Sequence, residues 1–276
     1  MFTPKSLLPD RAGEVFFMFQ RGDNAYRRRD GAALSVFAFF CYVQIVILRS
    51  EEGGTGMKEN EKRYLKAGVY LIVAFVVWTA IICFVDVQAA GPNGTEIGLA
   101  AVNTWFHRLT GVHMGLYTVT DWLGLVPILI CFGFGALGAI QLMSRKSLFR
   151  VDADIIMLGV YYVLIIILYL LFEMIPINYR PVLIDGRLEP SYPSSTALLV
   201  LSVMPTLEFQ MGRRAGRTVR TAASVFSAAF SLFMVAGRAV SGVHWLSDII
   251  GSVLLSTGMF TLYRYGVCLL DRRREE

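Results

Sequence analysis

The segment GRAVSGVHWLSD, residues 237–248, places three ionisable side chains between two strongly apolar segments. His244 and Asp248 are four residues apart, so at the start of a helix they would lie on one face, where the carboxylate can accept the imidazole Nδ1 proton. This bond would leave Nε2 free as a nucleophile and would stabilise the ring when it becomes positive. Arg238 lies six residues earlier. These residues alone fit two interpretations, a reaction centre or an ion pair that joins two helices.

A second polar cluster, residues 176–194, contains Arg180 and leads into the segment YPSSTALL. A proline, then Ser194 and Ser195, then an apolar run predict the start of a helix. The free N–H groups and the positive end of such a helix can bind an anion, although an ordinary serine N-cap would have the same sequence. Two arginines, a helix start and a His/Asp pair are together the parts that hold and attack one phosphoryl group.

Several apolar segments must position these residues. The chain is 55% hydrophobic and 17% charged, which excludes an ordinary soluble domain. Four runs are uncharged, namely residues 67–85, 122–144, 155–172 and 221–237. Each has a length in the range of ~17–25 residues that crosses a bilayer core. The sequence therefore predicts an all-α fold, a polytopic membrane helical bundle. We expect six core transmembrane helices, at about 66–86, 121–143, 154–175, 195–211, 219–238 and 245–267.

Basic residues predict the orientation of this bundle. They gather before the first span, in the connectors 144–153 and 211–220, and in the C-terminal tail. These four segments alternate so that they share one face, which the positive-inside rule makes cytoplasmic. Both termini of the core domain are then cytoplasmic, and both polar clusters are extracytoplasmic. Nucleic-acid binding is not expected, because the lysines and arginines lie in short connectors rather than on one helix face.

The N-terminal region does not fit this pattern. Residues 31–48 form a further apolar run, but three arginines precede it, and they would face outside if it spanned the membrane. The segment EEGGTGM, which ends at Met57, can be encoded by a ribosome-binding sequence and a start codon. We therefore expect 57–276 to be the membrane domain and 1–56 to be an extension that is not made natively. A seventh span or a signal anchor is the alternative.

The long connector 87–120 has apolar residues at helical spacing and few charges. It is expected to form an amphipathic helix on the outer leaflet, with Trp105, Phe106 and Tyr117 at the interface. We expect no chemistry from its two histidines. The cysteines also predict neither a disulfide nor a zinc site, because they lie in apolar segments without metal-ligand spacing.

The sequence resembles the type 2 phosphatidic acid phosphatase family, the membrane branch of the superfamily that includes the vanadium haloperoxidases. That family has three motifs, Lys-x6-Arg-Pro, Pro-Ser-Gly-His and Ser-Arg-x5-His-x3-Asp. This chain has EMIPINYRP, PSST and GRAVSGVHWLSD in the same order. The third motif is the most specific, and the resemblance covers about residues 64–268.

The resemblance implies a role for each matching residue. His244 would attack phosphorus and form a phosphohistidine, and Asp248 would orient the imidazole. The remaining matched positions would bind the phosphoryl oxygens, and they are Arg180, Arg238, Ser194, Ser195 and Thr196. The resemblance implies neither a metal ion nor any other cofactor.

Three positions depart from the family motifs: Glu173 replaces a lysine, Gly237 replaces a serine, and Thr196 replaces the histidine that protonates the leaving group in that family. Losing a general acid typically lowers a rate by about 10²–10⁴. A lipid diphosphate would tolerate the loss, because it expels phosphate rather than an alkoxide. Otherwise a substitute acid is required, and the candidates are Glu173, Asp185, Glu189, Tyr192 and His113.

We therefore expect a metal-independent lipid phosphatase of the cell membrane, acting on a lipid phosphate or, by preference, on a lipid diphosphate of the polyprenyl type. Its expected partners are that substrate and membrane lipids. Two alternatives stay open. One is a catalytically impaired protein that binds or transports a lipid phosphate. The other is a lipid phosphotransferase, in which an acceptor hydroxyl intercepts the phosphohistidine in place of water.

Overall fold

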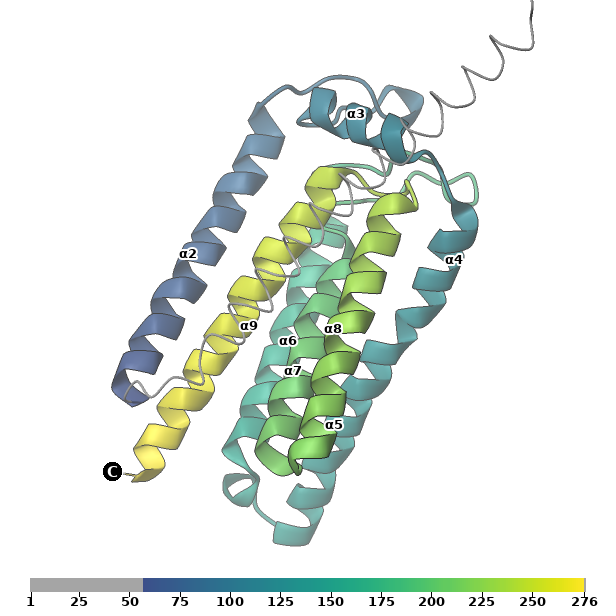
Figure 1. The fold of residues 1–276 in the computed structure, drawn as a ribbon. Helices are drawn as coiled ribbons and strands as arrows, with labels where there is room; N and C mark the ends of the chain where they lie inside the picture. Colours follow the sequence, from purple (N-terminus) through teal and green to yellow (C-terminus); the bar gives the residue numbers. More distant parts are fainter. Residues whose placement is uncertain (1–56, 276) are drawn as a thin grey trace, which may run out of the picture.

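The computed structural model describes residues 57–275, which form a bundle of long helices standing side by side (Figure 1). This confirms the predicted all-α membrane bundle, and no strand is assigned within the described range. The predicted extension 1–56 lies outside the described residues. The α-helices are α2 (Met57–Phe84), α3 (Ala100–Thr110), α4 (Met114–Leu123), α5 (Leu125–Arg145), α6 (Ala153–Met174), α7 (Ser195–Arg214), α8 (Arg217–Val240) and α9 (Leu246–Glu275).

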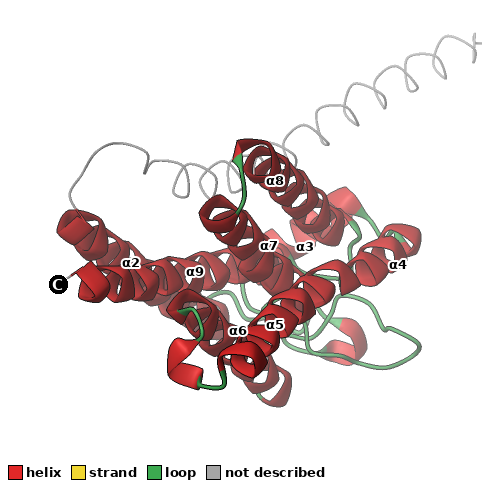
Figure 2. Cartoon of the chain, turned by 90° about the horizontal axis from the view of Figure 1, so that it is seen from below, coloured by secondary structure: helices red, strands yellow, loops and turns green. Residues whose placement is uncertain are grey.

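Each predicted span corresponds to one long helix, but the spans differ in character. Within residues 57–275, five helical segments are long and apolar enough to cross a membrane. The remaining predicted span, 195–211, is α7, whose sequence is more polar. This helix contacts α5, α6, α8 and α9, and Figure 2 shows it between α8 and the α5–α6 pair. Much of α7 is therefore buried by protein, which explains why its polar side chains are tolerated.

The second span begins earlier than the sequence predicts. The helix starts at Met114 rather than near residue 121, and α4 continues through Gly124 into α5 as one apolar segment. Only α3 lies across the end of the bundle (Figure 1), as expected for part of the connector 87–120. Tyr117 is therefore on the spanning helix and not on a surface helix. This correction brings the α4 side chains next to the polar clusters.

A buried asparagine fixes α3 to the start of α9. Asn103 Nδ2 donates to the Gly98 carbonyl oxygen at 2.8 Å and to Ser247 Oγ at 2.9 Å, while its Oδ1 accepts the Ser247 N–H at 3.1 Å. On the neighbouring connector, Trp245 Nε1 donates to the Tyr179 carbonyl oxygen at 2.7 Å. These contacts fix the turn between α8 and α9, because its C-terminal end is bonded both to α3 and to the α6–α7 connector.

The predicted basic connectors lie at the other end of the bundle from this turn (Figure 1). There Arg213 pairs with Asp154 at 3.2 Å and with Asp271 at 2.8 Å, which joins α6, α7 and α9. Arg214 also pairs with Asp154, at 2.8 Å. The basic end and the end with the polar clusters are therefore opposite, which is the arrangement that the alternation of connectors predicts.

Candidate active site

His244 lies in the turn between α8 and α9 and is buried. Its Nδ1 atom is 3.2 Å from the carbonyl oxygen of Ser191, whereas Asp248 Oδ2 is 3.7 Å away. The expected hydrogen bond from Nδ1 to Asp248 is therefore replaced by one to a backbone carbonyl. The reason is that His244 precedes α9, so the two side chains do not share a helix face. A carbonyl can only accept, which places the proton on Nδ1 and leaves Nε2 with its lone pair.

Asp248 is fully buried in the first turn of α9. Its Oδ2 accepts the Trp245 N–H at 2.9 Å, and Asn178 Nδ2 donates to its Oδ1 at 3.4 Å. The carboxylate therefore caps the start of α9 and ties the α6–α7 connector to it. Its negative charge still lies near the imidazole, where it stabilises a positive ring.

The surroundings of His244 favour a neutral imidazole. Burial, helped by the charges of Arg180 and Arg238 and opposed by Asp248, lowers the pKa of His244 to about 4. Near neutral pH the ring is therefore unprotonated at Nε2, which is the form that can act as a nucleophile. The Nε2 atom is itself buried and has no hydrogen-bond partner among the described residues.

Arg238, in the last turn of α8, is held mainly by α4. Its Nη2 donates to Asp121 Oδ1 at 3.1 Å and also to Thr196 Oγ1. Its Cζ lies 4.9 Å from the centre of the Tyr117 ring, a cation–π distance. The Nε and Nη1 atoms are buried without a hydrogen-bond partner in the described part of the chain.

Arg180 is carried by a loop that folds back on itself before α7. The loop pairs Tyr179 with Pro190, and the Arg180 N–H donates to the Glu189 carbonyl oxygen at 3.0 Å. The Glu189 carboxylate forms an ion pair with Arg180, 3.1 Å from Nε, but neither Nε nor Nη1 has a hydrogen-bond partner in the described region. The Arg180 guanidinium also faces the Tyr117 ring, at 5.8 Å.

The predicted helix start is present, because α7 begins at Ser195 with Ser194 as its N-cap. The Ser194 N–H donates to the Asp248 carbonyl oxygen at 3.3 Å, so it is less available to an anion than the sequence suggested. The first-turn N–H groups of Ser195 and Thr196 have no acceptor within the helix. These two groups are the better candidates for contacts to a phosphoryl oxygen.

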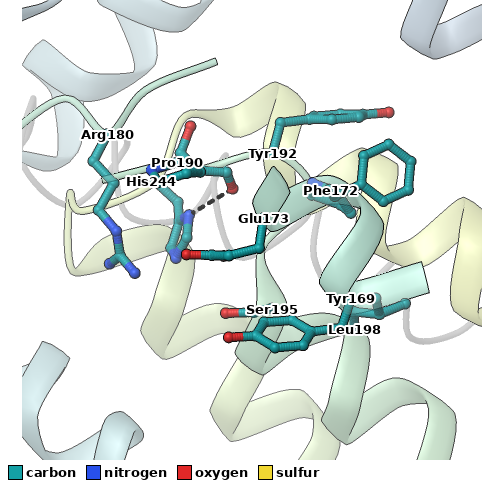
Figure 3. Close-up of a pocket in the computed structure, with 11 residues that line it drawn as sticks. Tyr169, Phe172, Glu173, Arg180, Pro190, Tyr192, Ser195, Leu198 and His244 are labelled. Atoms are coloured by element: carbon teal, nitrogen blue, oxygen red, sulfur yellow. Dashed lines mark hydrogen bonds between the residues drawn. The ribbon is translucent and has the colours of Figure 1, made fainter. Parts of the chain in front are cut away.

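A small pocket, partly open to the surroundings, lies at this end of the bundle. Figure 3 shows Glu173 and Arg180 extending toward the imidazole of His244 within it. Ser195 also lines the pocket. Arg238 is not among the lining residues, but it faces the same Tyr117 ring as Arg180. The apolar part of the wall comes from α6 and α7 and consists of Tyr169, Phe172 and Leu198.

The five candidate acids differ in their access to this pocket. Glu173 and Tyr192 line it. Burial raises the pKa of Tyr192, and its hydroxyl is hydrogen-bonded to Thr79 at 2.7 Å, so it is a poor proton donor. Glu189 lies against Arg180, and His113 Nε2 contacts the Thr110 carbonyl oxygen at 2.9 Å. Asp185 is at the tip of the loop, with a φ of 50°.

Sequence reasoning missed the contribution of α4. Tyr117 faces both arginines, and Asp121 is paired with one of them. The available signal was the spacing, since a tyrosine and an aspartate four residues apart share one helix face. It was missed because the connector was assigned to the membrane surface.

The chain is similar to known proteins in sequence pattern and in fold. A family model described as PAP2 superfamily matches residues 133–268. The fold is similar to the crystal structure of a transmembrane PAP2-type phosphatidylglycerolphosphate phosphatase from Bacillus subtilis, with a TM-score of 0.50 and 15% sequence identity. That similarity covers 75% of this chain and 96% of the other. No curated protein sequence matches the chain.

Proposed function

Since the chain belongs to the PAP2 superfamily, we propose that it is an integral membrane phosphatase that removes the terminal phosphoryl group of a lipid phosphate or, by preference, of a lipid diphosphate. The observation that carries the proposal is the set of buried nitrogen atoms at one end of the bundle. Nε and Nη1 of both Arg180 and Arg238 lack hydrogen-bond partners in the described region, as does Nε2 of His244, although the Glu189 carboxylate lies 3.1 Å from Arg180 Nε. Buried polar atoms are normally satisfied, so the guanidinium donors are expected to bind an anion, with the Nε2 lone pair of His244 facing it.

The proposed reaction uses these atoms in two steps. In the first, the Nε2 lone pair of His244 attacks phosphorus and the bond from phosphorus to the leaving-group oxygen breaks. The two arginines hold the phosphoryl oxygens, and Asp248 stabilises the ring while it is positive. In the second step, water attacks phosphorus, the phosphorus–nitrogen bond breaks, and inorganic phosphate leaves with Nε2 again unprotonated.

The identity of the leaving group follows from Thr196. Its hydroxyl is an acceptor for Arg238, and a threonine is too weak an acid to protonate an alkoxide. A diphosphate lipid expels a lipid monophosphate, which is a far weaker base and leaves without a strong acid. Glu173 is the carboxyl group that lines the pocket, and it is our candidate donor for monoester substrates.

The wall of the pocket supports a lipid substrate. Its α6–α7 side carries Tyr169, Phe172 and Leu198, so apolar groups border the polar end of the site. A headgroup can then reach His244 while its chains stay in the apolar region beside these helices. By the positive-inside rule, the site is on the extracytoplasmic side of the cell membrane and the basic connectors are cytoplasmic.

A substrate panel tests this function. The purified protein in detergent is incubated, with a chelator present, with polyprenyl diphosphate, phosphatidate and phosphatidylglycerol phosphate, and released phosphate is measured. We expect turnover of the diphosphate to exceed that of the monoesters and to survive chelation. His244→Ala should abolish turnover, and turnover that survives this change would remove the mechanism.

One observation favours a second candidate. With Thr196 bonded to Arg238, the proton donor expected from the family is missing, as in a protein that binds or transports a lipid phosphate without cleaving it. In that case labelled lipid phosphate binds to the purified protein and no substrate in the panel is turned over. Phosphate release without transfer to added alcohols would indicate hydrolysis, whereas formation of a phosphorylated alcohol would indicate phosphotransfer.

A further inference from the structure

The α4 residues that contact Arg238 lie before the segment that matches the superfamily, and none of the three motifs contains them. Asp121 is the charged one. It forms the only carboxylate contact to Arg238 recorded within residues 57–275. What this carboxylate does to phosphate binding follows from the shape of the guanidinium group.

A guanidinium binds an oxyanion bidentately through one of two edges, formed by Nε with Nη2 or by Nη1 with Nη2. Both edges need an Nη2 hydrogen. In Arg238 this nitrogen, which carries two hydrogens, has two acceptors, Asp121 Oδ1 and Thr196 Oγ1. A phosphoryl group can therefore form a bidentate contact with Arg238 only if one of these acceptors withdraws.

Exposure identifies the acceptor that can withdraw. About half of the Asp121 side chain, 56%, is exposed, against 1% for Arg238. Thr196 is part of the first turn of α7 and has little freedom to move away. The Tyr117 ring, 4.9 Å from Arg238 Cζ, would keep the guanidinium in place after Asp121 had left. The contacts of Arg238 with Thr196 and Tyr117 can therefore stay while its contact with Asp121 is displaced.

We propose that Asp121 is a displaceable anion that competes with the phosphoryl group for Arg238 and so limits how tightly the site retains inorganic phosphate. This inference rests on the proposed function, because it assumes that Arg238 binds phosphate. Asp121 is a positioning residue and touches no reacting atom. The competition makes product release faster, because the carboxylate returns to Arg238 Nη2 as phosphate leaves.

Glu189 provides a matched control. It also lies against a phosphate-site arginine, 3.1 Å from Arg180 Nε, and it is likewise partly exposed. It contacts Nε alone, so the edge formed by Nη1 and Nη2 of Arg180 is not taken by it. Asp121→Asn and Glu189→Gln each remove one negative charge from the site, but only the first weakens a contact that blocks an edge of the guanidinium.

The test is equilibrium binding of radiolabelled inorganic phosphate to the full-length protein in detergent, which does not depend on turnover. We expect Asp121→Asn to tighten phosphate binding by about tenfold, since the ion pair with Arg238 is replaced by a weaker bond to an uncharged amide oxygen. Asp121→Ala should tighten it at least as much, and Glu189→Gln should change it by less than about threefold.

Each other outcome overturns the proposal. Unchanged or weaker binding in Asp121→Asn would mean that the carboxylate only holds Arg238 in position. Equal tightening in both charge-removing variants would mean that net charge alone matters. Arg180→Ala separates this failure from that of the proposed function: if it weakens binding, the phosphate site stands and only the role of Asp121 is wrong. If it changes nothing, or if no variant binds phosphate, both proposals fail.

Discussion

The Nδ1 atom of His244 lies 3.2 Å from the carbonyl oxygen of Ser191, so the loop before α7 orients the imidazole carried by the α8–α9 turn. A backbone carbonyl keeps its acceptor character at every pH, which fixes the proton on Nδ1. Asp248, 3.7 Å from Nδ1, is then left to stabilise positive charge on the ring. Orientation and charge stabilisation are thus divided between two groups from different segments of the chain.

This division predicts the behaviour of Asp248→Asn. The tautomer of His244 is retained through Ser191, but the negative charge is lost, so activity should fall without disappearing. A unit charge near 4 Å is worth several kcal/mol in a protein environment, and we expect kcat to fall by about 10²–10³-fold. Phosphate-release assays on the purified variant would measure this, with thermal unfolding in detergent as the control for folding.

The comparison with His244→Ala makes this prediction decisive. A loss in Asp248→Asn as complete as that in His244→Ala would show that the carboxylate sets the tautomer after all. Unchanged activity would show that its charge is not used.

The pH dependence of the reaction should show the low pKa of His244. Burial lowers this pKa to about 4, below the usual value near 6.5, so the neutral nucleophile is present above that range. Activity due to this group should be constant from about pH 5 to neutrality and fall as the pH drops through about 4. The measurement is kcat/KM against pH, expressed per concentration of substrate dianion, because the substrate phosphate itself titrates near pH 6. A remaining acid limb near pH 6.5 would contradict it.

The lowered pKa of His244 also makes the free energy of unfolding rise with pH. The unfolded chain binds a proton on this histidine at a higher pH than the folded one, so the contribution of His244 is fully present above about pH 6.5 and is lost as the pH falls toward 4. Thermal unfolding of His244→Gln, which has no such titration, should therefore depend less on pH within that window.

The fold could be predicted from the sequence because lipid imposes a strong pattern. The uncharged runs locate α2, α5, α6 and α8, since a charge inside the membrane would cost free energy, although α2 begins ten residues before its run. The boundaries failed at α4, where the polar side chain of Asp121 looked like the end of a connector. It is in fact paired with Arg238, and such a long-range partner is not visible in local composition.

The site was predictable in its parts but not in its contacts. The motifs brought His244, Arg180 and Arg238 together correctly as residues of one end of the bundle. The Ser191 carbonyl could not be foreseen, because any residue type supplies a carbonyl and only the fold of the loop aims it. Tyr117 is similar, since a tyrosine in an apolar helix is ordinary until two arginines face it.

The leaving-group argument leads to a prediction for Thr196→His. The introduced imidazole would supply the acid that the threonine cannot, so hydrolysis of a monoester such as phosphatidate should rise, by up to about 10²-fold. Hydrolysis of a diphosphate should change much less, because its leaving group needs little protonation. Steady-state rates on the two substrates, measured with one protein preparation, give the ratio of monoester to diphosphate hydrolysis.

Thr196→Val is the control for this change. It removes the acceptor for Arg238 Nη2 without adding an acid, so it should not raise the monoester rate. Adding Glu173→Gln to each protein then tests the substitute acid. If Glu173 protonates monoesters, the amide should lower the monoester rate of the wild type but not that of Thr196→His, where the imidazole has taken over. An equal rise for both substrates in Thr196→His would count against leaving-group protonation as the missing step, because the histidine would then be acting on binding.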